Sequence, residues 1–84
     1  MFIEISKNKF VNINQATIIE VRNFSIMFRT NGKDFSFCGH KDPRIPKAVL
    51  KEIMTRYNEG RRVITYDEYQ LLISEISLVF CDDD

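Results

Sequence analysis

The clearest pattern in the chain is an alternation of apolar and polar residues on both sides of Asn31-Gly32, over residues 24–30 and 33–38. Asparagine and glycine tolerate a positive φ at both central positions of a two-residue turn, and the resulting type I′ turn matches the twist of the strands that it joins. The pattern therefore predicts a β-hairpin with a fixed register. The facing pairs on its apolar side are Thr30 with Lys33, Phe28 with Phe35 and Ile26 with Phe37, and on its other side Arg29 with Asp34 and Met27 with Ser36.

Three shorter segments before this hairpin also have the composition of strands, namely residues 2–5, 10–13 and 17–21. The last of them is rich in β-branched residues, which favour strands. A turn at Arg22-Asn23 would join it to the hairpin. The facing pairs would then be Val21 with Phe24 and Ile19 with Ile26, which extends the apolar side of the hairpin. We therefore predict an N-terminal antiparallel β-meander of four to five strands with one apolar face.

One or two C-terminal helices are predicted to cover this apolar face. From Ile45 to Tyr57, apolar residues recur every four positions. Pro46 disfavours helical geometry in the residue before it, so we expect the first helix to start at Pro46. Asp42 as the cap, with Pro43 at the first helical position, is the alternative start. The residue Gly60 suits the position just past the helix end.

The second helix begins with the sequence of a capping box. In this motif the Thr65 hydroxyl accepts a hydrogen bond from the Glu68 amide, and the Glu68 side chain reaches back to Thr65. Apolar residues follow at helical spacing, namely Tyr69, Leu72, Ile73, Ile76 and Phe80. Residues 78–81 fit either the end of this helix or an edge strand. The prediction is a single α+β domain over residues 1–81, with residues 82–84 as a frayed acidic tail.

Length and composition are consistent with such a domain. A chain of 84 residues, 44% hydrophobic and 12% aromatic, is typical of one globular unit. No apolar stretch approaches the roughly 18 residues that cross a bilayer, and the first residues lack the features of a secretory signal. The two cysteines, Cys38 and Cys81, are then expected to be reduced thiols. These observations predict a cytoplasmic protein without membrane association.

The charges are unevenly distributed along the chain, although their sum is zero. Residues 1–62 hold twelve basic and six acidic residues, a net charge of +6. Residues 63–84 hold six acidic residues and no lysine or arginine, a net charge of −6. Such a polarity is typical of a surface that binds polyanions, or of two faces that attract each other within the fold or between copies.

The segment around the only histidine offers two weak candidates for chemistry. Cys38, His40 and Asp42 would share a face in an extended chain, as in a thiol–imidazole–carboxylate arrangement, but the glycine and proline around them indicate a bend. Cys38, His40 and Cys81 could supply three metal ligands, but they lack the paired spacings of structural zinc sites. The three scattered glycines cannot form a phosphate-binding loop. We therefore expect no enzymatic activity, no metal and no cofactor.

A basic surface is the strongest candidate for a binding site. In the first predicted helix, Arg44, Lys47 and Lys51 share one side, and Arg61 and Arg62 follow after its end. These side chains could neutralise the phosphates of a nucleic acid. Acidic residues interrupt the same helix, however, and this mixture is also typical of an ordinary solvated face.

The aromatic residues do not add a second candidate. Phe24, Phe28, Phe35 and Phe37 could stack on bases, as in sheet-based RNA-binding proteins. Their alternation is also what a half-buried antiparallel sheet requires, and amphipathic helices are present to cover that sheet. We therefore assign these four side chains to the core.

The sequence thus predicts a small non-enzymatic interaction module of the cytoplasm. It would act through protein–protein contact, either with an unknown protein or with a second copy as a homodimer, since short strands tend to leave a sheet edge free. The alternative is a nucleic-acid-binding accessory protein. It would use the basic face of residues 41–62, namely Arg44, Lys47, Lys51, Arg61 and Arg62.

Overall fold

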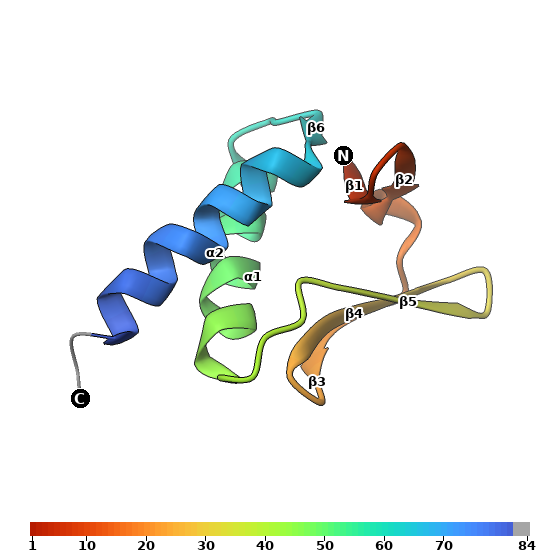
Figure 1. Ribbon diagram of the computed structural model, residues 1–84. Coiled ribbons are helices and arrows are strands. Elements are labelled where there is room, and N and C mark those ends of the chain that lie inside the picture. Colours follow the sequence, from red (N-terminus) through yellow and green to blue (C-terminus); the bar gives the residue numbers. More distant parts are fainter. Residues whose placement is uncertain (82–84) are drawn as a thin grey trace.

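The computed structural model describes residues 1–81, which form two small sheets and two α-helices (Figure 1). The strands are β1 (Phe2–Ser6), β2 (Lys9–Asn12), β3 (Ile18–Arg22), β4 (Ser25–Thr30), β5 (Lys33–Phe37) and β6 (Val63–Ile64). A short 3-10 helix, η1 (Ile13–Gln15), separates β2 from β3, and the helices are α1 (Arg44–Asn58) and α2 (Tyr66–Cys81). The predicted acidic tail, residues 82–84, lies outside the described residues.

The strands are divided between two three-stranded sheets. Strands β3, β4 and β5 form an antiparallel meander. In the other sheet, β1 pairs with β2 in antiparallel orientation and with β6 in parallel orientation. The α+β class and an antiparallel meander are therefore confirmed, but the meander has three strands and not the predicted four to five. The first two strands belong to a separate sheet, which the chain completes only after α1.

The hairpin around Asn31-Gly32 has the predicted register. Its facing pairs include Ile26 with Phe37 and Phe28 with Phe35. The two turn residues have positive φ values of 52° and 75°, as a type I′ turn requires. On the other side of the hairpin, Arg29 Nε donates a hydrogen bond to Asp34 Oδ1 at 2.7 Å.

The turn between β3 and β4 lies one position later than predicted. It is formed by Asn23 and Phe24, which have φ values of 52° and 72°. The facing pairs are therefore Val21 with Ile26 and Ile19 with Phe28, and the predicted pairs were wrong. Since the register moves by two residues, the side chains of β3 keep their predicted face. Phe24 is the exception, because it lies in the turn, 53% exposed, and does not belong to the core.

Helix α1 starts at Arg44, two residues before the predicted start at Pro46. The Asp42 carboxylate accepts a hydrogen bond from the Arg44 amide at 3.0 Å. Pro46 is tolerated because it lies in the first turn, where backbone amides have no helical partner. Past the other end of α1, Gly60 has the positive φ of 90° that was expected of it.

Helix α2 begins at Tyr66, directly after the predicted capping residue. The Thr65 hydroxyl accepts a hydrogen bond from the Glu68 amide at 3.2 Å, as predicted. The Glu68 carboxylate pairs with Arg61 and Arg56 instead of reaching back to Thr65. Residues 78–81 continue the helix, which decides between the two predicted alternatives.

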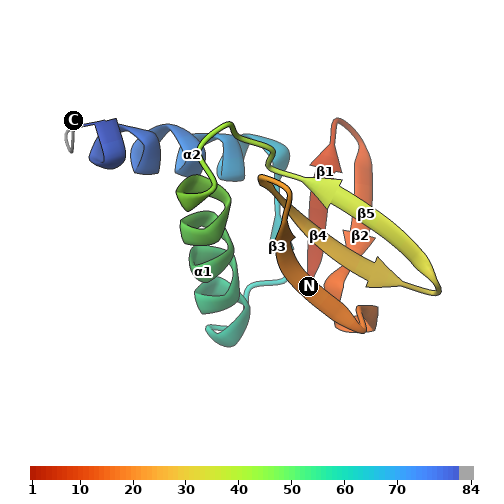
Figure 2. The ribbon, with the colours of Figure 1, turned by 90° about the horizontal axis from the view of Figure 1, so that it is seen from below.

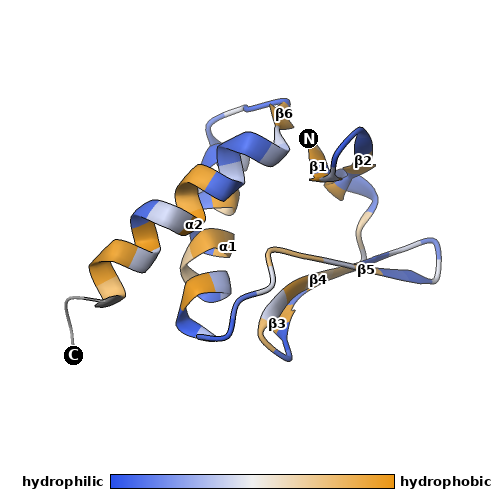
Figure 3. Ribbon diagram, in the orientation of Figure 1, coloured by the Kyte–Doolittle hydropathy of each residue, from blue (hydrophilic) through white to orange (hydrophobic). Residues whose placement is uncertain are grey.

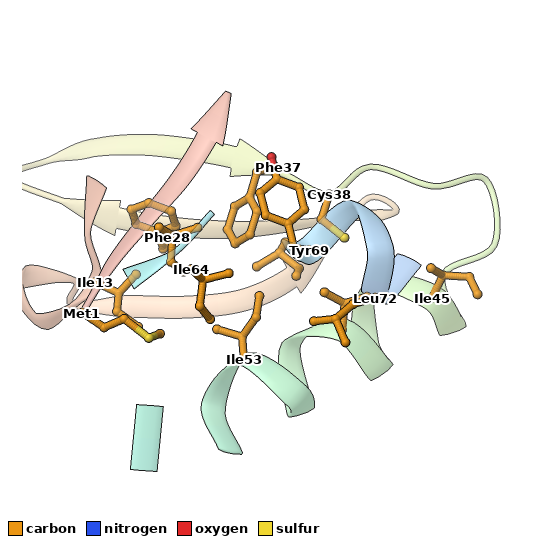
Figure 4. Packing of buried hydrophobic residues seen from close by; sticks show 13 residues of the cluster. Met1, Ile13, Phe28, Phe37, Cys38, Ile45, Ile53, Ile64, Tyr69 and Leu72 are labelled. Atoms are coloured by element: carbon orange, nitrogen blue, oxygen red, sulfur yellow. The ribbon is translucent and has the colours of Figure 1, made fainter. Parts of the chain in front are cut away.

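The core lies between the two sheets and the helices (Figures 2 and 4). Its buried side chains include Ile3 and Ile64 from one sheet, Phe28 and Phe37 from the other, Val49 and Ile53 from α1, and Tyr69 and Leu72 from α2. Phe37 packs edge-on against Tyr69, with ring centroids 5.6 Å apart. This contact joins the meander to α2, so the helices pack on the apolar side of the sheet.

Candidate interaction surface

Helix α2 carries large apolar side chains on two opposite sides. On its inner side, side chains such as Tyr69 are buried in the core. On its outer side, Leu71 and Leu78 are 61% and 69% exposed, and Val79, which lies at the edge of this side, seven positions after the buried Leu72, is 65% exposed. Leu71 and Leu78 are seven positions apart, about two turns of the helix, and therefore share one side. Glu75 lies between these two leucines, and we call Leu71, Glu75, Leu78 and Val79 the outer face of α2.

The end of α2 extends beyond the other elements. Figures 1 and 2 show its C-terminal turns running past α1 and away from both sheets. Figure 3 shows that these turns are largely apolar. Among the elements that the structure describes, none covers the outer face. Several exposed large apolar side chains on one helix make this face a candidate binding surface for another macromolecule.

A shallow depression of 260 Å³ lies between α1 and the end of α2. It is lined by Arg44, Lys47, Ala48 and Lys51 of α1 and by Phe80 of α2. The Arg44 guanidinium lies 4.6 Å from the centre of the Phe80 ring, as in a cation–π contact. Lys47 and Lys51 are exposed and have no ion pair within residues 1–81. The structure therefore brings three of the five predicted basic residues together.

The other two predicted basic residues lie elsewhere. Arg61 follows the far end of α1, about 20 Å along the helix from Arg44. Its guanidinium pairs with the Glu68 carboxylate at 2.5 Å. Arg62 precedes β6, and its carbonyl accepts a hydrogen bond from the Phe2 amide at 2.8 Å. The predicted basic residues thus form two separate groups.

A second exposed apolar area lies on the sheet formed by β1, β2 and β6. Its side chains Phe2, Phe10 and Val63 are 47%, 50% and 39% exposed. Phe2 is paired with Val63, whereas the next residue, Ile3, is buried on the opposite face. We did not predict an exposed aromatic area. The alternation in Phe2-Ile3-Glu4-Ile5 could have indicated it, since residues 2 and 4 share a face.

Within residues 1–81, no hydrogen bond joins Cys38 to His40. Cys38 is 6% exposed, and burial raises the pKa of its thiol to about 12, so the thiolate is disfavoured at neutral pH. The Nδ1 atom of His40 accepts a hydrogen bond from the Asp42 amide at 3.0 Å. His40 also lines a second depression, of 240 Å³, beside the first one.

The metal hypothesis combined Cys38 and His40 with Cys81. Among the described residues, no group of three or more histidine, cysteine or acidic side chains is placed to hold a metal ion. The side chain of Cys81 lies outside the described part of the chain. The arrangement of Cys38 and His40 therefore gives no support to a metal site.

No helix in the described part of the chain has both the length and the apolar character needed to cross a membrane.

The structure offers three candidate surfaces, namely the outer face of α2, the basic depression beside it and the sheet face around Phe2. The chain matches no family of known proteins, no curated protein and no solved structure.

Proposed function

We propose that the protein is a non-enzymatic interaction module that binds another protein through the outer face of α2. The observation that carries this proposal is the exposure of Leu71, Leu78 and Val79 along one side of a helix whose opposite side is buried. Removing the exposed part of these side chains from water against a partner is favourable, by about 25 cal/mol for each Å² of apolar surface buried. Leu71 and Leu78, two helical turns apart, can act as the anchors with which a helix packs its apolar side into the groove of a partner.

The packing of α2 supports a binding role. Its inner side is fixed by the core and by the Tyr69 hydroxyl, which donates a hydrogen bond to the Ile5 carbonyl at 2.8 Å. The first turns of α2, which carry Leu71, are therefore held by the core, and a preorganised surface loses little conformational entropy on binding. We place the protein in the cytoplasm, because Cys38 is a buried free thiol of the kind that reducing compartments maintain.

Site-specific photo-crosslinking in the native cells tests this proposal. A photoreactive phenylalanine analogue replaces Leu78 in the full chain, and as a control it replaces Gln70, which is also exposed on α2 but lies away from the outer face. We expect protein adducts from position 78 and none from position 70. Positions 71 and 79 should repeat the result for position 78. If all three outer positions give no adduct, the outer face is not a binding surface and the proposal fails.

The alternative function, a nucleic-acid-binding accessory protein, is favoured by a different observation. Lys47 and Lys51 are exposed, have no ion pair within residues 1–81, and line the same depression as the Phe80 ring. Cationic side chains beside an aromatic ring suit the backbone and bases of a single strand. The depression around Phe80 is therefore the place where we would expect such a ligand.

Charge reversal tests the alternative. The variant K47E/K51E should bind a mixed pool of short DNA and RNA more weakly than the wild type and with a smaller salt dependence, because two phosphate contacts are lost. Fluorescence anisotropy at low and near-physiological salt measures both quantities. The variant K7E/K33E makes the same change of net charge at exposed positions elsewhere and should bind like the wild type. Equal affinity of K47E/K51E and the wild type would exclude this site.

A further inference from the structure

We propose that the partner of the outer face of α2 is a second copy of this chain, and that α2 of each copy lies over the depression between α1 and α2 of the other. This deepens the proposed function, on which it rests, by naming the partner. The two surfaces involved are the outer face of α2 and the depression lined by Lys47, Ala48, Lys51 and Phe80, together with Arg44. They are complementary in apolar character and in charge.

The depression offers apolar surface to an incoming helix. Ala48 and Phe80 contribute to its lining, and the two lysines that also line it carry aliphatic stems that can add apolar surface. Because Ala48 is small, a branched side chain such as Leu78 from a second copy can enter there. The exposed apolar side chains of α2 in one copy can therefore pack against apolar surface of a second copy.

The charges of the two surfaces are opposite. Glu75 lies about one helical turn from both Leu71 and Leu78 and is exposed. Lys47 and Lys51 are likewise one turn apart on α1 and exposed. None of these three charged side chains has an ion pair within the part of the chain that the structure describes. Docking α2 on the depression of a second copy places Glu75 beside the two lysines and pairs these charges.

The net charges of the two helices have the same sense. Helix α1 holds four basic residues and one acidic residue, a net charge of +3, and α2 holds three acidic residues and no lysine or arginine, a net charge of −3. A two-fold arrangement brings the acidic helix of each copy against the basic helix of the other. The contact is then made twice, because a two-fold axis repeats every interaction. The same arrangement buries the exposed apolar turns of both α2 helices.

Complementary charge reversal tests this arrangement. The wild type, E75K and K47E/K51E are compared by sedimentation equilibrium under reducing conditions, and the two variants are also mixed in equal amounts. We expect the wild type to dimerise and each variant alone to dimerise about tenfold more weakly or worse, because like charges then face each other. The mixture should recover the wild-type affinity, since both contacts between the two variants again pair a lysine with a glutamate.

A matched set of charge changes away from both surfaces controls for net charge. The control for E75K is E59K, and the control for K47E/K51E is K7E/K33E. Each control makes the same change of net charge at exposed positions. The control variants should dimerise like the wild type, both alone and mixed. A wild type that stays monomeric at millimolar concentration overturns the proposal. A mixture that dimerises no better than E75K and K47E/K51E do separately also overturns it.

The outcomes distinguish this inference from the proposed function. A monomeric wild type whose position 78 crosslinks to a different protein excludes the second copy and keeps the interaction module. An adduct of two copies, together with recovery in the mixture, supports both. If the depression instead binds nucleic acid, K47E/K51E should weaken that binding, and none of the variants should change the association state of the protein. This result would exclude the second copy as the partner.

Discussion

The Glu4 carboxylate joins the first strand to the start of α2, 62 positions further along the chain. Its Oε1 atom accepts a hydrogen bond from the Tyr66 amide at 2.9 Å, and its Oε2 atom accepts one from the Asn8 amide at 3.0 Å. The Tyr66 amide lies in the first turn of α2, where no helical carbonyl is available to accept it. Glu4 therefore fixes where α2 leaves the sheet, and with it the direction of the outer face.

We predict that Glu4→Gln lowers the free energy of unfolding at neutral pH, because one neutral amide oxygen replaces two charged acceptors. The two backbone amides lower the pKa of Glu4 from its ordinary value of 4.5. The stabilisation by a carboxylate with a lowered pKa is fully present above pH 4.5 and is lost as the pH falls through the lowered value. Urea denaturation of the wild type and the variant should therefore show a difference that shrinks in acid.

Glu59→Gln is the matched control for this experiment. The Glu59 side chain is exposed and forms no hydrogen bond or ion pair within residues 1–81. Its replacement should leave the stability unchanged at neutral and at acidic pH. If the effect of Glu4→Gln is equally large in acid, the ionised carboxylate is not what holds the start of α2.

The turn between β3 and β4 provides a second prediction. Phe24 has a φ of 72°, a left-handed conformation that is unfavourable for a bulky residue, and its side chain is 53% exposed. Phe24→Gly turns this segment into the favoured Asn-Gly turn and should stabilise the protein by about 0.5–1 kcal/mol, since relief of strain exceeds the added entropy of the unfolded chain. Thermal unfolding measures the gain. Phe24→Ala, which keeps the Cβ atom, should not show it, and equal gains in both variants would contradict the role of strain.

The hydroxyl of Tyr69 provides a third prediction. Tyr69 is 1% exposed, and its hydroxyl donates a hydrogen bond to the Ile5 carbonyl at 2.8 Å. Tyr69→Phe keeps the ring in the core but leaves this carbonyl without its donor, and should cost about 1–2 kcal/mol of stability. Tyr66→Phe is the control, because the Tyr66 hydroxyl has no hydrogen bond in the described residues. Denaturant titrations that show the same small effect for both variants would contradict this assignment.

Local turn chemistry explains how much of the fold the sequence predicts. The register of β4 and β5 follows from Asn31-Gly32, because a two-residue turn leaves no freedom in the pairing of its flanking strands. The turn at Asn23-Phe24 lacks a glycine, and the pattern alone placed it one residue too early. The parallel pairing of β6 with β1 joins segments about sixty residues apart, and no local signal encodes such a contact.

The candidate surfaces were predicted less completely, for a related reason. Arg44, Lys47 and Lys51 follow helical spacing, so their shared side was visible in the sequence. The inner stripe of α2, with Tyr69 and Leu72, was also visible in the sequence, but the pattern does not say whether apolar residues outside that stripe, such as Leu71 and Leu78, are covered by another element. Only the packing of α2 shows that these two leucines are left in water.

The last prediction concerns Cys38, whose thiol was one of the candidates for chemistry. Burial raises the pKa of the Cys38 thiol to about 12, so the thiolate is disfavoured at neutral pH, and the side chain is only 6% exposed. In a Cys81→Ser variant, which leaves Cys38 as the only thiol, reaction with a disulfide reagent should be slow in the folded protein and fast in denaturant. Stopped-flow absorbance compares the two rates, with free glutathione as the reference. A folded protein that reacts as fast as glutathione would show an accessible, activated thiol and restore the hypothesis of a reactive site at Cys38.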